Sequence, residues 1–192
     1  MFRDTHHYIT DSAYAVLLTQ YQPPTKQYKL AFMPHYQTRN LLDFKKVCET
    51  ANIKYIDPCQ SVEKTLGEIA SSELLITEAM HGAILADAFR VPWTRIQIYS
   101  HYFEGRQVAE QKWLDWLYSM ELKPQTVSFS PLLNQLLPPR FVWRQLAKIV
   151  LNQLLSDVGQ FSQLAQLSSE PILQSKVAQL HQAMEDLNFE YR

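Results

Sequence analysis

Between Tyr28 and Tyr99 the chain alternates short apolar runs with longer stretches in which apolar residues recur every three or four positions. The short runs are typical of buried strands, and the longer stretches are typical of amphipathic helices. The predicted strands are 28–33, 53–56, 74–77 and 94–99, and the helices between them are 41–52, 61–72 and 81–90. Because strands and helices alternate over short links, the pattern predicts an α/β fold with a parallel sheet and helices on both faces.

The segments outside this run have a different character. A short apolar piece, 13–18, precedes it, and two helices are predicted at 108–120 and 140–155 around a proline-punctuated connection, 124–139. A Gln-rich helix at 171–189 follows. We therefore expect one α/β lobe over residues 1–122 and a helical C-terminal extension, 123–192, packed on the same domain.

Composition narrows the class of protein. The 192 residues are 46% hydrophobic, enough for one substantial core, and the formal net charge of −1 with no long basic run argues against nucleic-acid binding. No window approaches the roughly 18 apolar residues of a membrane span, and the N-terminus lacks the pattern of a signal peptide. Cys48 and Cys59 match no metal-ligand spacing, so we expect no metal site. We expect both cysteines to be reduced thiols in a cytoplasmic protein.

The pair His81-Gly82 follows the apolar strand 74–77, where a helix is predicted to begin. Ligands of open parallel sheets bind at such strand ends, and a helix start attracts anions with its unpaired N–H groups. Gly82 would let an anion approach the backbone, and His81 would act beside it as acid or base. The alternative is a histidine that hydrogen-bonds a neighbouring carbonyl. Glu78 is a candidate to orient His81 or to bind a sugar hydroxyl, or else a helix-start carboxylate.

The loop after the first predicted strand carries His35, Tyr36 and Arg39. If the two strands are neighbours, His35 and His81 point toward one crevice. Arg39 is then a candidate clamp for an anion, with a solvated helix-start residue as the alternative reading.

Four stretches of the chain, ITDSAY, FMPHY, YIDP and ITEAMHGAILADAFRVPW, together resemble the polysaccharide pyruvyl transferase family, in its bacterial exopolysaccharide-biosynthesis branch. The resemblance implies two Rossmann-like lobes in a glycosyltransferase-B-like arrangement, of which this chain carries the C-terminal lobe. It implies transfer of pyruvyl from phosphoenolpyruvate to two hydroxyls of a sugar or lipid-linked oligosaccharide, without a cofactor. His81 matches the family's general acid/base, and Ala79 and Met80 match residues that hold phosphoenolpyruvate.

The resemblance carries two departures. The family has an arginine where this chain has Ala79, so either Arg39 or His35 replaces that cation or the donor differs. The N-terminal lobe is expected to be missing, which leaves a truncated product, one half of a split protein or a degenerate copy as interpretations. Two other functions stay open: a nucleotide-sugar glycosyltransferase and a non-catalytic module. For its assembly and location, the chain could pair with a partner that carries the N-terminal lobe, form a homo-oligomer or associate peripherally with a membrane.

Overall fold

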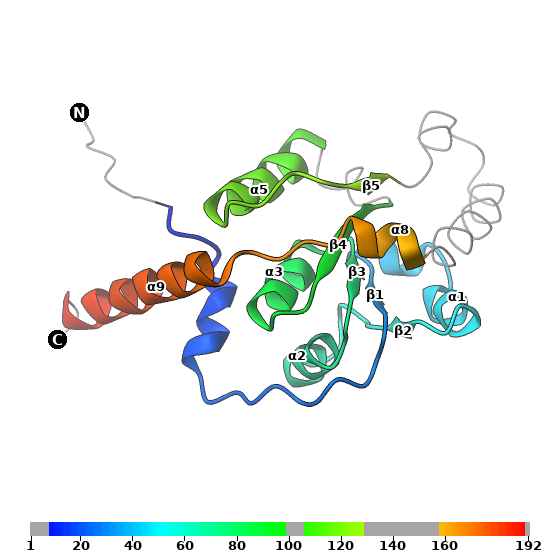
Figure 1. The fold of residues 1–192 in the computed structure, drawn as a ribbon, viewed down its shortest axis with the longest axis horizontal. Coiled ribbons are helices and arrows are strands. Elements are labelled where there is room, and N and C mark those ends of the chain that lie inside the picture. Colours follow the sequence, from blue (N-terminus) through cyan, green and yellow to red (C-terminus); the bar gives the residue numbers. More distant parts are fainter. Residues whose placement is uncertain (1–7, 99–105, 129–157, 191–192) are drawn as a thin grey trace.

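The computed structural model describes residues 8–98, 106–128 and 158–190, and these three segments make up the fold (Figure 1). Five strands form one sheet in the order β2-β1-β3-β4-β5, with every neighbouring pair parallel. The strands are β1 (Ala31–Met33), β2 (Lys54–Tyr55), β3 (Leu75–Thr77), β4 (Trp93–Gln97) and β5 (Val127–Ser128). The prediction of an α/β fold with a parallel sheet is confirmed.

The strand order determines where a ligand can bind. The chain leaves β1 toward one edge of the sheet to form β2, and then returns across β1 to form β3. β1 and β3 are direct neighbours, with Phe32 opposite Ile76. In open parallel sheets a reversal of this kind leaves a crevice outside the carboxyl ends of the two strands. The fold therefore provides one crevice, between the β1 and β3 loops.

Helices follow the strands in the alternation that the sequence predicts. They are α1 (Phe44–Thr50), α2 (Val62–Ala70), α3 (Met80–Ala88), α5 (Arg106–Ser119), α8 (Val158–Gln163) and α9 (Glu170–Glu190), with short 3-10 helices η1 (Ser12–Leu18) and η2 (Thr38–Asn40). Ser61, at the start of the helix predicted over 61–72, caps α2 by accepting a hydrogen bond of 3.3 Å from the N–H of Lys64. Asp43 caps α1 in the same way. Such caps satisfy N–H groups that have no partner inside the helix.

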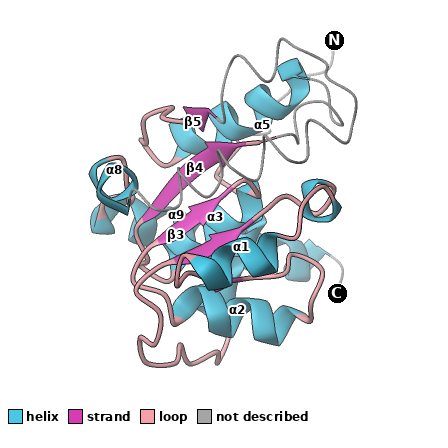
Figure 2. Ribbon diagram, turned by 90° about the vertical axis from the view of Figure 1, so that its right-hand side faces the viewer, coloured by secondary structure: helices cyan, strands magenta, loops and turns pink. Residues whose placement is uncertain are grey.

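Apolar side chains cover both faces of the sheet. Because successive strand residues point to opposite faces, Ala31 and Met33 join one buried cluster and Leu30 and Phe32 join another. The first cluster includes residues of η1, α2, α3, α5 and α9, and the second includes residues of α1 and α8. Accordingly α1 and α3 lie on opposite sides of the strands (Figure 2). Helices on both faces, the second part of the predicted fold, are thus confirmed.

Two parts of the chain differ from the predicted elements. The stretch 124–139 was expected to be a connection, but its residues Val127 and Ser128 form the fifth strand, paired with Ile96 and Gln97. A two-residue edge strand beside prolines is too short to produce a periodic pattern. The apolar piece 13–18 forms most of the 3-10 helix η1. The helix predicted at 140–155 lies outside the described residues.

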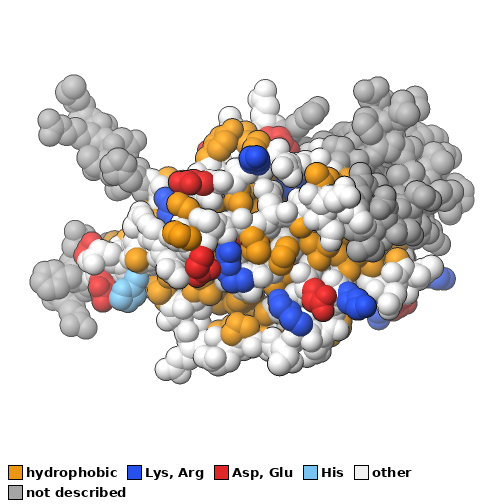
Figure 3. All heavy atoms as spheres, viewed as in Figure 1, with side chains coloured by type: hydrophobic (Ala, Val, Ile, Leu, Met, Phe, Trp, Pro, Cys, Tyr) orange, Lys and Arg blue, Asp and Glu red, His pale blue; other side chains and the backbone are white. Residues whose placement is uncertain are grey.

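The surface gives little sign of a single dominant charge. On the face shown in Figure 3, acidic and basic side chains are interspersed among apolar ones, in keeping with the formal net charge of −1. Among the residues that the structure describes, no helix is long and apolar enough to cross a membrane.

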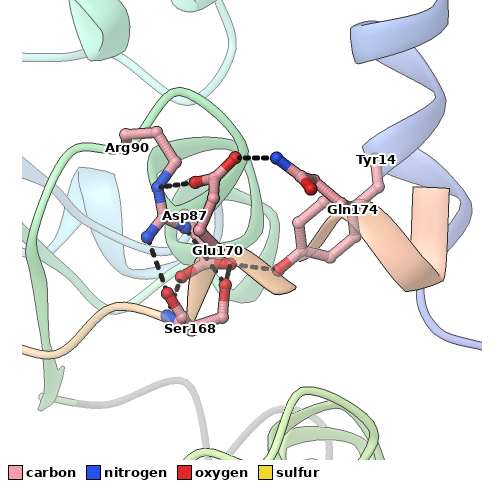
Figure 4. Close-up of polar contacts among 6 residues, drawn as sticks. All are labelled: Tyr14, Asp87, Arg90, Ser168, Glu170 and Gln174. Atoms are coloured by element: carbon pink, nitrogen blue, oxygen red, sulfur yellow. Dashed lines mark hydrogen bonds and ion pairs between the residues drawn. The ribbon is translucent and has the colours of Figure 1, made fainter. Parts of the chain in front are cut away.

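A buried carboxylate fastens segments from both ends of the chain to α3 (Figure 4). Asp87, fully buried, accepts hydrogen bonds from the hydroxyl of Tyr14 (2.7 Å) and from the N–H and hydroxyl of Ser168 (2.7 and 2.6 Å). Arg90 adds a bond of 2.6 Å to the Ser168 carbonyl and an ion pair with Glu170. Burial, and next the charge of Asp87, raise the pKa of the Tyr14 phenol. Its hydroxyl therefore stays protonated and donates a hydrogen bond to the carboxylate.

Replacing Tyr14 with phenylalanine tests this network. The variant removes a donor to Asp87 and an acceptor for the indole N–H of Trp116, which lies 3.3 Å from the hydroxyl. We expect the free energy of unfolding to fall by about 1–3 kcal/mol, because buried polar groups lose their partners. Urea denaturation measures the change. Tyr118→Phe is the control, since Tyr118 is 63% exposed; equal losses in the two variants would contradict the assignment.

Candidate active site

A cavity of about 310 Å³ opens at the carboxyl ends of the central strands. Its walls come mainly from the loop after β1, the connection between β3 and α3, the end of β4 and the N-terminal half of α5. This position is the crevice at which the strand order reverses. His35 and His81 both line the cavity, because β1 and β3 are paired neighbours. The sequence places His35 and His81 at one crevice only if their strands are neighbours, and β1 and β3 are neighbours. The chemical roles of the two histidines stay predictions.

Helix α3 begins at the wall of the cavity without a side-chain cap. Its N-cap residue is Ala79, which has no polar side chain to accept a hydrogen bond from the first turn. The Thr77 hydroxyl instead accepts from the N–H of Ala79 itself, at 3.0 Å. Ala79, Met80 and His81 all line the cavity. N–H groups of the first helical turn carry partial positive charge and attract anions. This end of α3 therefore suits a phosphate or a carboxylate.

Gly82 allows α3 to lie close to the sheet. A Cβ atom at this position would stand 2.7 Å from the Thr77 hydroxyl oxygen and 2.9 Å from the sulfur of Met33. Both distances are shorter than van der Waals contact, so a side chain here would push the helix away from β1 and β3. The position that a side chain would occupy at Gly82 therefore faces the strands. The sequence pattern predicts a different role for Gly82, in the approach of an anion to the backbone.

His81 stands at the mouth of the cavity. Its side chain is 68% exposed, and its Nε2 atom lies 3.8 Å from a carboxylate oxygen of Asp11. The other oxygen of Asp11 caps η1, accepting from the N–H of Ala13 at 2.8 Å. An imidazole in this position can reach both a ligand in the cavity and the solvent, which is what proton transfer requires.

His35 and Tyr36 form another wall of the cavity. Their rings are tilted against each other with centroids 4.5 Å apart, and Tyr36 is 52% exposed. The N–H of Gln37 donates to Nδ1 of His35 at 3.4 Å. An exposed aromatic ring at a cavity wall offers a surface on which a sugar ring can stack.

Arg39 lies apart from these residues. Its guanidinium donates to Asp57 at 3.1 Å, a hydrogen bond that raises the pKa of Arg39, and the arginine is not among the described residues that line the cavity. The same Asp57 oxygen also accepts from the N–H of Cys59. The structure therefore gives Arg39 a partner within the protein, and its predicted role as an anion clamp has no geometric support from the cavity.

Two cations that sequence reasoning did not single out, Arg95 and Lys112, line the cavity. Arg95 is 5% exposed, forms two hydrogen bonds with Glu110 at 2.9 and 2.6 Å, and lies 4.4 Å from the ring centre of Trp113. Gln97 also donates to Glu110. Arginine stacked on an aromatic ring and bonded at two points is held in one orientation.

A sequence signal for Arg95 existed. Arg95 and Gln97 are two residues apart in an otherwise apolar strand, so they share one face of it. Polar residues in that register at the carboxyl end of a buried strand point to a ligand or to a polar network. Lys112 had no such signal, because it reaches the cavity through the packing of α5.

In the described part of the chain, no group of three or more His, Cys, Asp or Glu side chains is arranged to hold a metal ion. Among the described lining residues, the groups available for chemistry include two imidazoles, two cations, the carboxylate of Glu78 and the N-terminus of α3.

The fold and the cavity define an α/β domain whose candidate ligand site lies at the reversal of a parallel sheet. Residues 5–98 match the family model described as polysaccharide pyruvyl transferase, so this part of the chain is similar to that family. The matched segment contains β1 to β4 and α3 with His81. The resemblance seen in the sequence is confirmed.

A curated relative supports the same branch of the family. The chain is 36% identical, over 115 residues, to the succinoglycan biosynthesis protein ExoV of Rhizobium meliloti (strain 1021). The match covers 59% of this chain and 34% of that protein, so the chain spans about a third of the length of this relative. No solved structure matches the chain significantly.

Two glycines provide a matched test of the close packing of α3. Gly82→Ala should lower the free energy of unfolding by about 1–3 kcal/mol, because the new Cβ overlaps Thr77 and Met33. Gly67→Ala, in α2, should raise it by about 0.5–1 kcal/mol, because its Cβ would meet nothing nearer than the Tyr21 hydroxyl at 3.9 Å and alanine favours helix. Thermal and urea unfolding measure both changes, and the same sign in the two variants would refute the packing argument.

Proposed function

We propose that the protein acts in exopolysaccharide biosynthesis as a pyruvyl transferase, moving the pyruvyl group of phosphoenolpyruvate onto a sugar as a cyclic ketal. The family match over residues 5–98 and the identity to a succinoglycan biosynthesis protein support the class of reaction. The single observation that carries the proposal is the placement of His81 on an uncapped helix start, inside a cavity that Arg95 and Lys112 also line.

The donor carries a phosphate and a carboxylate, and the cavity offers groups that match them. The first turn of α3 provides N–H donors, and Lys112 provides a positive charge from α5. Arg95 contributes an oriented guanidinium whose charge is partly balanced by Glu110. These cations come from β4 and α5, so they replace the arginine that the family has at the position of Ala79. The interpretation that Arg39 replaces it is less well supported, because Asp57 binds that side chain.

The chemistry needs a proton donor and acceptor close to the donor molecule. Protonated His81 gives a proton to the methylene carbon of phosphoenolpyruvate, and a sugar hydroxyl adds to the adjacent carbon and returns its proton to the imidazole. A second hydroxyl of the same sugar then displaces phosphate and closes the ketal, and the proton of this hydroxyl leaves with the phosphate. The methylene becomes a methyl group, two C–O bonds form, and one C–O bond to phosphate breaks. The scheme requires no metal or organic cofactor.

The acceptor in this proposal is a sugar, free or as part of a lipid-linked oligosaccharide. Tyr36 and His35 provide an aromatic wall on which a pyranose ring can stack. We further propose a cytoplasmic location, because the free thiols of Cys48 and Cys59 suit a reducing compartment.

Phosphorus NMR of phosphoenolpyruvate with the full chain tests donor binding. We expect the wild type to broaden or shift the donor signal and Lys112→Ala to weaken binding roughly tenfold, about 1.4 kcal/mol. His81→Ala should bind within a few-fold of wild type, while phosphate release with a panel of methyl hexosides falls by roughly 10²–10⁴. His181→Ala, on the exposed surface of α9, is the matched control and should behave as wild type.

Each outcome of that experiment distinguishes a function. Perturbation of a uridine or guanosine diphosphate sugar, with no effect on phosphoenolpyruvate, would replace pyruvyl transfer with glycosyl transfer. Silence from both ligands, relieved on adding a protein that carries the rest of the family's length, would identify a module that works only with a partner. Full phosphate release by His81→Ala would overturn the role of His81.

A further inference from the structure

Glu78 is a buried carboxylate among the residues that line the cavity. It lies between Thr77, the last residue of β3, and Ala79, the N-cap of α3, and it is 3% exposed. A carboxylate removed from water to this degree is unfavourable unless hydrogen bonds compensate its charge. The partners of this side chain therefore indicate what it does.

Both carboxylate oxygens accept hydrogen bonds from the backbone of neighbouring segments. One oxygen accepts from the N–H of His35 at 3.2 Å, and the other accepts from the N–H of Ile98 at 3.1 Å. The N–H of Glu78 donates to the carbonyl of Met33 at 3.0 Å. A single residue thus connects the ends of three adjacent strands, β1, β3 and β4.

The two bonds to the Glu78 carboxylate lie beyond the last residues that β3 pairs with β1 and β4, whereas the bond from the Glu78 N–H belongs to the Met33–Thr77 pair. The register ends with Met33 opposite Thr77 on one side and with Thr77 opposite Arg95 on the other. Past this point the strands separate to form the cavity, and ladder hydrogen bonds no longer set their spacing. The Glu78 side chain spans the separation on both sides.

Each connected segment supplies residues to the cavity. The segment held through His35 carries the imidazole and the Tyr36 ring, and the segment held through Ile98 follows Arg95 and Gln97. His81 is three residues after Glu78 on the same connection. One side chain, three residues before His81, thus bonds to both segments.

We propose that Glu78 is a positioning residue. It sets the distance between the wall of the cavity that His35 and Tyr36 form and the wall that Arg95 and Gln97 form. It acts through the backbone N–H groups of His35 and Ile98, and this role differs from the sugar binding or His81 orientation predicted from sequence. The consequence for phosphoenolpyruvate rests on the proposed function, whereas the structural role does not.

The carboxylate is the group that this geometry requires. Glutamine has the same length, but its amide offers one oxygen and one NH2 group, so one of the two backbone N–H groups would face a donor. Aspartate keeps both acceptors but is one methylene shorter, so it reaches both segments less well. The two variants separate the effect of charge and acceptor number from the effect of reach.

Amide hydrogen exchange in Glu78→Gln tests the structural role. We expect the His35 or Ile98 amide to exchange at least roughly tenfold faster than in wild type, because one of them loses its acceptor, while amides of α1 keep their rates. The imidazole signals of His35 should also shift in a carbon–proton spectrum. Glu73→Gln is the matched control, since Glu73 is exposed and precedes β3 at the opposite end of the strand.

The donor titration provides the functional readout. Glu78→Gln should weaken phosphoenolpyruvate binding roughly tenfold, with a loss in the free energy of unfolding no larger than the about 1–3 kcal/mol that one buried N–H without an acceptor costs. Glu78→Asp should recover part of the loss in binding. If the wild type binds no phosphoenolpyruvate, the proposed function fails, but the exchange rates still decide the role of Glu78. Unchanged exchange at both amides, or a uniform increase over the whole molecule in Glu78→Gln and Glu78→Asp alike, would overturn the proposal.

Discussion

The close approach of α3 to the ends of β1 and β3 is the constraint on which the rest of the site depends. Gly82 leaves no room for a side chain between the helix and the Thr77 and Met33 side chains. This contact brings the uncapped first turn of α3 to the cavity wall and places His81 at its mouth. If the helix moved outward by the diameter of a methyl group, the N–H groups of its first turn would no longer face a ligand at hydrogen-bonding distance.

Two buried carboxylates hold α3, one at each end, and they connect the helix to different parts of the fold. Glu78, before the helix, connects it to the backbone of β1 and β4 on the side of the cavity. Asp87, near its end, connects it to η1 and to the segment before α9 on the far side. Carboxylates bonded to several N–H and O–H donors tolerate burial and restrict the geometry of everything they touch. The helix is thereby held against the sheet at one end and against both flanking segments at the other.

The sequence predicts those features that arise from local patterns and from general topology. The run Leu74 to Thr77 and the cap at Ser61 follow from periodicity and hydrogen-bonding preference, and the convergence of His35 with His81 follows from the rule for strand ends. Arg95 was open to prediction from its register with Gln97. Lys112 and the pairing of Arg39 with Asp57 were not, because they depend on how α5 and a loop pack in three dimensions. The strand β5 gave no periodic signal because it is only two residues long.

The lack of a side-chain cap at Ala79 has a thermodynamic consequence. A helix start without a side-chain cap leaves its first-turn N–H groups to water, so an anion that binds them would add to the stability of α3. Binding and folding are then linked, and the folded state gains free energy as the logarithm of ligand concentration relative to the dissociation constant. Since Gly82, Glu78 and Asp87 join this helix to three strands and to both flanking segments, occupancy of one small cavity would be felt as a change in the melting temperature of the whole domain.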